Sequence, residues 1–279
     1  MVRIVVLLEN RTESPKLKCK HGLSLYIETN THKILFDTGP NDLFLKNAEV
    51  LGVDISAVDI AVISHGHADH CGGLGCFLKA NKRAKIYIRQ EAFEKHYVKA
   101  LGGIPFYAGI DRTLAENAAN DRFVFTDELC KIAKDKLTLF SDVSGCFPLP
   151  KSDGNLFVKR DGKMVGDVFG HEQNLIVTSG DKSILICGCA HAGIVNIIDK
   201  AKTLTGNFPS DVVGGFHLYE PVKRRYENGG YISSVADVLA RFESSYYTCH
   251  CTGVKAYEKM KPRLENRLTY IHTGSEIFF

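Results

Sequence analysis

The sequence HGHADH at residues 65–70 brings four side chains that can bind metal ions close together. They are His65, His67, Asp69 and His70, and their imidazole nitrogens and carboxylate oxygens suit zinc, iron or manganese. His65 and His67 are two residues apart on a segment expected to be extended, so their side chains point the same way. Asp69 and His70 follow beyond a turn. This spacing predicts two ions side by side, with His65 and His67 on one and Asp69 and His70 on the other.

A buried strand is expected to carry this loop, because residues 60–63 are apolar and rich in β-branched side chains. Gly66 and the pair Gly72 and Gly73 allow the backbone to bend sharply and to approach neighbouring segments closely. A polar surface loop with exposed histidines is the alternative interpretation. Four potential ligands in one short pattern after a strand make that alternative a poor one.

Three apolar segments in the second half of the chain also end in a histidine, namely His191, His217 and His250. The ends of strands are where an α/β sheet assembles its site, so we expect His191 and His250 to join the first loop. For each of the three, the alternative is a buried ring bonded to a backbone carbonyl. That alternative has the most weight for His217.

Apolar alternation and turn signals predict the elements that position these residues. Up to residue 88 the expected order is strand, strand, strand, helix, strand, helix, strand, and the second half alternates strands with helices beginning at Ile194 and Val254. Residues 127–133 are predicted to form a short helix.

Residues 90–127 mix glycine, proline and aromatic residues without a period. Long irregular segments of this kind are often lids or substrate-binding elements, and a plain surface insertion is the alternative. His96, Phe106 and Tyr107 are the lid candidates.

The chain has 279 residues and is 44% hydrophobic, which predicts a single domain over residues 1–279, with a first half to about 165 and a second half from about 166. Its net charge is +3, and lysine and arginine are scattered, so nucleic acid is not an expected partner. No apolar run reaches the roughly 18 residues of a membrane span. The apolar start runs into charged sequence without a cleavage site, unlike a signal peptide.

The nine cysteines are an odd number, and the pairs Cys187/Cys189 and Cys249/Cys251 lack CxxC spacing. In a chain with ample core, this pattern favours reduced thiols in the cytoplasm over a disulfide framework.

The motif at residues 65–70 resembles the HxHxDH signature of the metallo-β-lactamase superfamily. The sequences GCAHAGIVN at 188–196, GGFHL at 214–218 and HCTG at 250–253 resemble one of its subfamilies. That subfamily comprises the 7,8-dihydropterin-6-methyl-4-(β-D-ribofuranosyl)aminobenzene-5′-phosphate synthase-like metal-dependent hydrolases. The resemblance runs from HGLS at 21–24 to the glycine and serine at 274–275.

The resemblance implies an α/β (α+β) fold, a four-layer αββα sandwich of two mixed sheets with helices outside. It also implies two divalent metal ions, zinc first, with iron or manganese as alternatives. Asp37, which follows an apolar strand, would brace the metal loop, and capping of the next helix is the alternative. The first ion would take His65, His67 and His191, and the second would take Asp69, His70 and His250. Positions left open would bind a water whose pKa falls towards about 7.

One departure concerns the aspartate that bridges the ions in many members of the superfamily. Here the corresponding strand ends in Cys187-Gly188-Cys189. Either Cys189 ligates one ion as a thiolate, or only water or hydroxide forms the bridge. The third histidine of the first ion is a second ambiguity, because His171 also precedes a strand and rivals His191.

The expected activity is hydrolysis of a small, phosphate- or pterin-bearing molecule by a metal-activated water. Asp69 and His217 would act in catalysis, with His217 donating a hydrogen bond to the substrate or leaving group. A transferase that joins a pterin to a ribofuranosylaminobenzene phosphate is the alternative within the same subfamily. The residues expected to line the substrate pocket are Asn10, Glu172, His96 and Tyr107.

Three other classes of protein are alternatives to such an enzyme. A nuclease of this fold usually adds a basic RNA-binding part, which the sequence lacks. A redox protein like the di-iron oxygen reductases carries a flavin domain, for which 279 residues leave no room. A non-catalytic metal-binding module would not need a nearly complete ligand set.

Overall fold

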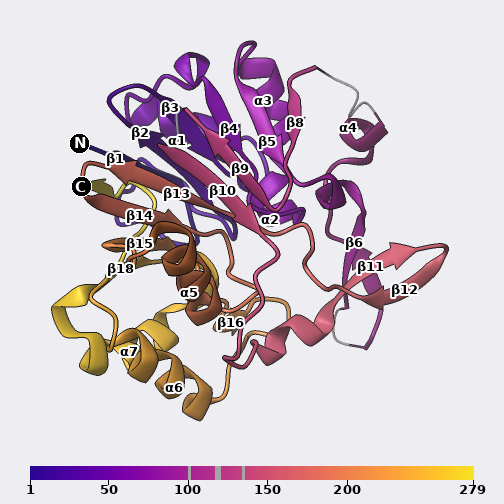
Figure 1. Cartoon of the computed structure of the whole chain (residues 1–279). Coiled ribbons are helices and arrows are strands. Elements are labelled where there is room, and N and C mark those ends of the chain that lie inside the picture. The colour runs from indigo at the N-terminus through magenta and orange to yellow at the C-terminus, as the bar shows by residue number, and fades with distance from the viewer. Residues whose placement is uncertain (100–101, 117–120, 134–135) are drawn as a thin grey trace.

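The computed structural model describes the chain from Met1 to Phe279 except for residues 100–101, 117–120 and 134–135 (Figure 1). Its first sheet has seven strands, with β1 to β3 antiparallel and β3, β4, β5 and β8 parallel. In sheet order these strands are β20 (Glu276–Phe278), β1 (Arg3–Leu8), β2 (Ser24–Glu28), β3 (Lys33–Phe36), β4 (Ile60–Val62), β5 (Lys85–Ile88) and β8 (Phe123–Phe125).

The second sheet also has seven strands and is likewise mixed, because β14, β15, β18 and β19 run parallel while β9, β10, β13 and β14 are antiparallel. Its order is β19 (Leu268–Tyr270), β18 (Ser245–Thr248), β15 (Asp211–Gly214), β14 (Lys182–Ile186), β13 (Gln173–Ser179), β10 (Leu137–Ser141) and β9 (Leu129–Ile132).

The two sheets pack face to face because apolar side chains occupy both faces of their strands. On β1, Ile4 and Val6 point into the core between the sheets, whereas Val5 and Leu7 point to the helices outside. Helices α1 (Leu43–Val50) and α3 (Leu74–Ala80) cover the first sheet. Together with the helices on the second sheet, described next, this arrangement confirms the four-layer sandwich with helices outside (Figure 1).

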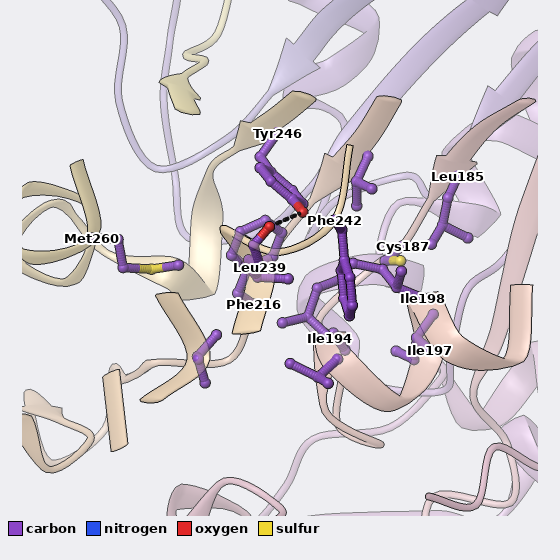
Figure 2. Close-up of a cluster of buried hydrophobic side chains, with 14 of the residues drawn as sticks. Leu185, Cys187, Ile194, Ile197, Ile198, Phe216, Leu239, Phe242, Tyr246 and Met260 are labelled. Atoms are coloured by element: carbon purple, nitrogen blue, oxygen red, sulfur yellow. Dashed lines mark hydrogen bonds between the residues drawn. The ribbon is translucent and has the colours of Figure 1, made fainter. Parts of the chain in front are cut away.

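Helices α5 (Ile194–Thr205), α6 (Gly229–Leu239) and α7 (Val254–Leu264) cover the second sheet. Figure 2 shows the apolar cluster between these helices and the sheet. In it Leu185 of β14 and Cys187, which directly follows β14, pack in the same cluster as Ile194 and Ile198 of α5. Within this cluster the Tyr246 hydroxyl donates to the backbone carbonyl of Leu239 at 2.8 Å. Its hydrogen-bonding requirement is therefore met inside the apolar layer.

Residues 127–133 do not form the predicted helix. They contain β9, which pairs with β10 at the edge of the second sheet. Along β9 the exposed Leu129 alternates with the half-buried Cys130, and Ile132 is buried. Pairing with a neighbouring strand decides the structure of this segment, and that pairing partner lies outside any local sequence window.

The excursion at residues 90–127 is largely regular where the structure describes it. Strands β6 (Lys95–Lys99) and β7 (Pro105–Tyr107) join β11 (Leu156–Arg160) and β12 (Lys163–Gly166) in a separate four-stranded sheet, at the right of Figure 1. The short helix α4 (Arg112–Glu116) follows, and β8 then returns to the first sheet.

The sheets do not divide the chain at residue 165, because β9 and β10 already belong to the second sheet and β20 returns to the first. Other short elements include α2 (Ala68–Cys71) and the paired strands β16 (Tyr219–Glu220) and β17 (Arg225–Tyr226). Of the helices that the structure describes, none combines the length and apolarity needed to cross a bilayer.

Candidate metal centre

Three buried imidazole rings, those of His65, His67 and His191, meet where strands of both sheets end. Their ring centroids lie 4.7 Å apart for His65 and His67 and 5.0 Å apart for each pair with His191. The Nε2 atoms of all three are buried and find no hydrogen-bond partner among the described residues. A buried nitrogen without a partner is costly, and a metal ion is a partner that would satisfy all three.

A second set of ligand atoms lies beside the first. His70 Nε2 is 3.1 Å from both Cys189 Sγ and His250 Nε2, and Asp69 Oδ2 is 3.3 Å from His250 Nε2. Tetrahedral metal bonds of about 2.0–2.3 Å place neighbouring ligands about 3.3–3.8 Å apart. These four side chains therefore have nearly the spacing of ligands around one ion. The Cys189 thiol also lies within 4.8 Å of ligand atoms of His65 and His191, between the two sets.

Asp37 fixes the orientation of the first loop. Its fully buried carboxylate accepts hydrogen bonds from Ser64 N and Ser64 Oγ and contacts His70 Nδ1, each at 2.7 Å. Ser64 Oγ in turn lies 2.9 Å from His65 Nδ1. With the Nδ1 atoms of both histidines held as donors, their Nε2 lone pairs face the centre.

The sequence did not predict Asp153, which connects His191 and His217. Asp153 Oδ1 lies 2.7 Å from His191 Nδ1 and 3.1 Å from His217 Nε2. Burial opposes the charge of this carboxylate, but the two neighbouring rings hold the pKa of Asp153 below its ordinary value. Asp153 lies in a turn-like sequence, and only the folded chain brings it to the two rings.

Two residues expected to bind substrate, Asn10 and Glu172, form hydrogen bonds with the ligand loops. Asn10 Nδ2 donates to the carbonyl of His250 at 3.0 Å, and its Oδ1 lies 3.1 Å from His250 Nδ1. The carboxylate of Glu172 accepts the backbone N–H groups of His191 at 2.7 Å and Ala192 at 3.0 Å. Burial raises the pKa of Glu172 to about 7.

His96 and His171 meet at the carboxylate of Asp167. His96 Nδ1 lies 2.9 Å and His171 Nε2 lies 3.1 Å from Asp167 Oδ2. The other nitrogen of His96 contacts the carbonyl of Glu91 at 3.2 Å, and that of His171 accepts the N–H of Gly66 at 2.9 Å. Both nitrogens of each ring are engaged, so of the two rivals only His191 has a free Nε2.

A cavity of about 360 Å³ opens above both ligand sets. Its walls are mostly apolar and come partly from the four-stranded sheet, which contributes Val98, Phe106 and Tyr107. Tyr107 therefore lies where a substrate-binding role was expected. Asp69, His191, His217 and His250 lie at the end where the ligand sets are.

His21, which the sequence did not single out as a site residue, also lines this cavity. Its Nε2 lies 3.2 Å from Asp69 Oδ2, and its ring stacks on that of His250 with centroids 4.5 Å apart. Gly22 beside it has a φ of 144°, and a Cβ there would come within 2.4 Å of the Asp69 carbonyl oxygen. A glycine is therefore needed for His21 to reach the metal loop.

Residues 17–201 match the family model of the metallo-beta-lactamase superfamily. Two proteins of Methanocaldococcus jannaschii are similar to nearly the whole chain. An uncharacterized protein is 31% identical over 281 residues, 99% of each chain. A 7,8-dihydropterin-6-methyl-4-(beta-D-ribofuranosyl)-aminobenzene-5'-phosphate synthase is 27% identical over 275 residues, 93% of this chain and 90% of that protein.

Solved structures give the same assignment of the fold. A metal-dependent hydrolase of the beta-lactamase superfamily superposes with a TM-score of 0.84 at 28% identity, over 100% of this chain and 99% of its own. Zn(2+)-bound PqqB from Methylobacterium extorquens, at 12% identity and a TM-score of 0.58, matches 99% of this chain and 100% of its own and shows the fold alone.

Proposed function

Because this chain belongs to the metallo-beta-lactamase superfamily, we propose that it is a metal-dependent hydrolase of a small molecule, with zinc as the expected ion. The observation that carries the proposal is that two groups of possible ligands meet at one end of an apolar cavity. One group is the three Nε2 atoms that lack a hydrogen-bond partner among the described residues, and the other is the set of four side chains around His70.

His65, His67 and His191 would hold a first ion, and Asp69, His70 and His250 would hold a second, with the Cys189 thiolate as a further ligand. The set of His65, His67 and His191 would leave a fourth position open for water, as is typical of catalytic zinc, whereas Cys189 would complete the second set to four ligands. A bound divalent cation would lower the pKa of water towards about 7 and stabilise negative charge that develops on the substrate.

The chain's own residues would prepare the site for this chemistry. Asp37 and Asp153 orient the ligand rings so that their Nε2 lone pairs face the centre. Asp153 and the neighbouring Cys251 thiol raise the pKa of the buried His217 against the effect of burial, so this ring would hold a proton that it can donate to the substrate or leaving group.

The apolar walls favour a substrate with a flat, apolar part. Phe106 and Tyr107 line one side of the cavity and Pro221 and Val222 also contribute. Such walls exclude water around the reacting groups. We propose a small molecule and not nucleic acid, since the net charge is only +3. All nine cysteines are free thiols, which supports a reducing compartment, the cytoplasm.

A transferase is the second candidate. It is favoured by the 27% identical relative named as a synthase that forms a pterin-bearing phosphate. In that case the same cations would polarise the joining groups. Mass spectrometry of reactions containing a dihydropterin and a ribofuranosylaminobenzene phosphate distinguishes it, because only a transferase yields a product that combines the two.

The test of the proposal is metal content together with turnover. Protein purified without chelator is analysed for zinc, iron and manganese by mass spectrometry and assayed on esters and phosphodiesters. We expect Asp69→Ala to lose the second ion and all turnover. His32→Ala is the control, because His32 forms a similar histidine–aspartate pair with Asp59, at 2.9 Å, outside the site. Turnover that survives in Asp69→Ala would contradict the proposal.

A further inference from the structure

Residues 167–173 contact both ligand loops, although the proposed ligand sets include none of them. We infer that His171, held by Asp167, is a positioning residue that fixes the peptide between His65 and His67 and does not bind metal. The inference rests on the proposed function, because it takes His65 and His67 as metal ligands.

The first support is the environment of Gly66, the residue between the two histidines. Its N–H donates to His171 Nδ1 at 2.9 Å. On its other side a Cβ would come within 2.5 Å of the carbonyl oxygen of Ala92. The peptide is thus confined between the His171 ring and the backbone at Ala92, so that a shift of this peptide would move both ligand rings.

The second support is the arrangement of protons on His171. A ring nitrogen that accepts an N–H must present its lone pair, so the proton of neutral His171 lies on Nε2. That proton is donated to Asp167 Oδ2, 3.1 Å away. His171 then has no lone pair left for an ion. His96 Nδ1, at 2.9 Å from the same oxygen, holds Asp167 from the other side.

The third support is that the same segment also holds the second loop. Phe169 stacks on His191 with centroids 4.3 Å apart and an angle of 2° between the rings. Glu172 accepts two backbone N–H groups of that loop. Gln173 N donates to the carbonyl of Ser64 at 2.8 Å. One short segment therefore fixes the position of both loops relative to each other.

A third metal ion is the competing explanation. His67, His96, Asp167 and His171 have ligand atoms within 4.8 Å of one another. His67 Nε2 lies 3.7 Å from Asp167 Oδ2. The hydrogen bond from Gly66 argues against this ion, because His171 could bind it through Nε2 only after losing the proton that Asp167 accepts.

Three substitutions at His171 separate the two roles. In His171→Asn, the amide oxygen takes nearly the place of Nδ1 and can accept the Gly66 N–H. In His171→Gln, the amide reaches the place of Nε2, and His171→Leu offers neither. Cobalt binding is titrated for each, with the visible spectrum as a report on coordination geometry. His32→Leu is the control for loss of a histidine–aspartate pair elsewhere.

We expect wild type, His171→Asn and the control to bind the same number of cobalt ions with the same spectrum. His171→Leu and His171→Gln should bind cobalt about tenfold more weakly or worse, the usual effect of removing a group that orients metal ligands, and their spectra should change. If His171→Leu does not fold, the comparison of Asn with Gln gives the same answer.

Two results would overturn the inference. The first is that His171→Leu or His171→Gln matches wild type in affinity and spectrum, because the contact with Gly66 would then have no effect. The second is that all three variants, including His171→Asn, lose one equivalent of cobalt while the other ions keep their affinity, because His171 would then be a ligand. A wild-type chain that binds no cobalt would instead refute the proposed function, and the inference with it.

Discussion

Cys189 occupies the position at which many members of the superfamily have an aspartate that bridges the two ions. Its thiol lies 3.1 Å from His70 Nε2 and between the two ligand sets. A thiolate is a softer ligand than a carboxylate and favours zinc or cobalt over manganese or magnesium. The choice of metal in this protein should therefore depend on a single sulfur atom.

Replacement of that sulfur tests the role of Cys189. Cobalt bound to a thiolate absorbs strongly in the near ultraviolet, and we expect the wild-type protein to show this band and Cys189→Ser to lose it. Metal affinity should fall because a hydroxyl is a poor ligand for these ions. Cys76→Ser, at a half-buried thiol on α3, is the matched control. A band of full strength in Cys189→Ser would show that the sulfur does not bind the ion.

Local spacing was sufficient to predict six side chains that the structure brings together, and their binding of metal stays a prediction. His65, His67, Asp69 and His70 share one short motif, and His191 and His250 each end an apolar strand. Spacing could not reveal Asp153 or His21, because their roles depend on contacts between segments far apart in the chain. The same limit applies to Asn10, Glu172 and His96, because the sequence could not reveal their contacts with loop backbone and with Asp167. Their binding of substrate stays a prediction.

The four-stranded sheet is the element that gives the cavity its apolar wall. Phe106 on β7 lines the cavity and is 45% exposed. Its free face is available to a substrate and makes no contribution to the core. The sequence predicted an irregular excursion at residues 90–127. That prediction missed β6, because β6 pairs with β11, which lies more than fifty residues later in the sequence.

Phe106→Ala tests whether this element binds substrate. Loss of the ring should raise KM about tenfold, equivalent to about 1.4 kcal/mol of binding free energy, because the apolar contact is removed. The number of bound ions and kcat should stay near wild type, since Phe106 is no ligand. Phe278→Ala on β20, at a ring that is 59% exposed, is the control. An unchanged KM would mean that the sheet does not contact the substrate.

At the scale of the whole molecule, the proposed metal ligands come from both sheets. The loop after β4 belongs to the first sheet, and His191 and His250 follow β14 and β18 of the second. The resemblance to the metallo-β-lactamase superfamily implied two sheets with helices outside, and apolar periodicity predicted only the order of strands and helices. It could not assign β9, β10 and β20 to their sheets, because membership of a sheet is decided by pairing and not by the pattern within one strand.

Metal removal should therefore destabilise the entire fold. A ligand present at 100 times its dissociation constant stabilises the native state by about 2.7 kcal/mol. For a chain of 279 residues that corresponds to a fall in Tm of roughly 5 °C on treatment with a chelator. Differential scanning calorimetry measures the change, and added zinc should reverse it. An equal Tm with and without chelator would contradict the idea that bound ions join the sheets. In Asp69→Ala the chelator should lower Tm by less, because this variant is expected to lack the second ion already.

The pairing of β20 with β1 has a consequence for synthesis. Residues 3–5 bond to residues 276–278, so β1 leaves the ribosome long before the strand that completes its outer side. Throughout translation the growing chain carries an apolar strand with one unpaired border, a surface on which nascent chains can associate. A chaperone that shields the N-terminal residues should accordingly raise the yield of native protein more than one that acts after release.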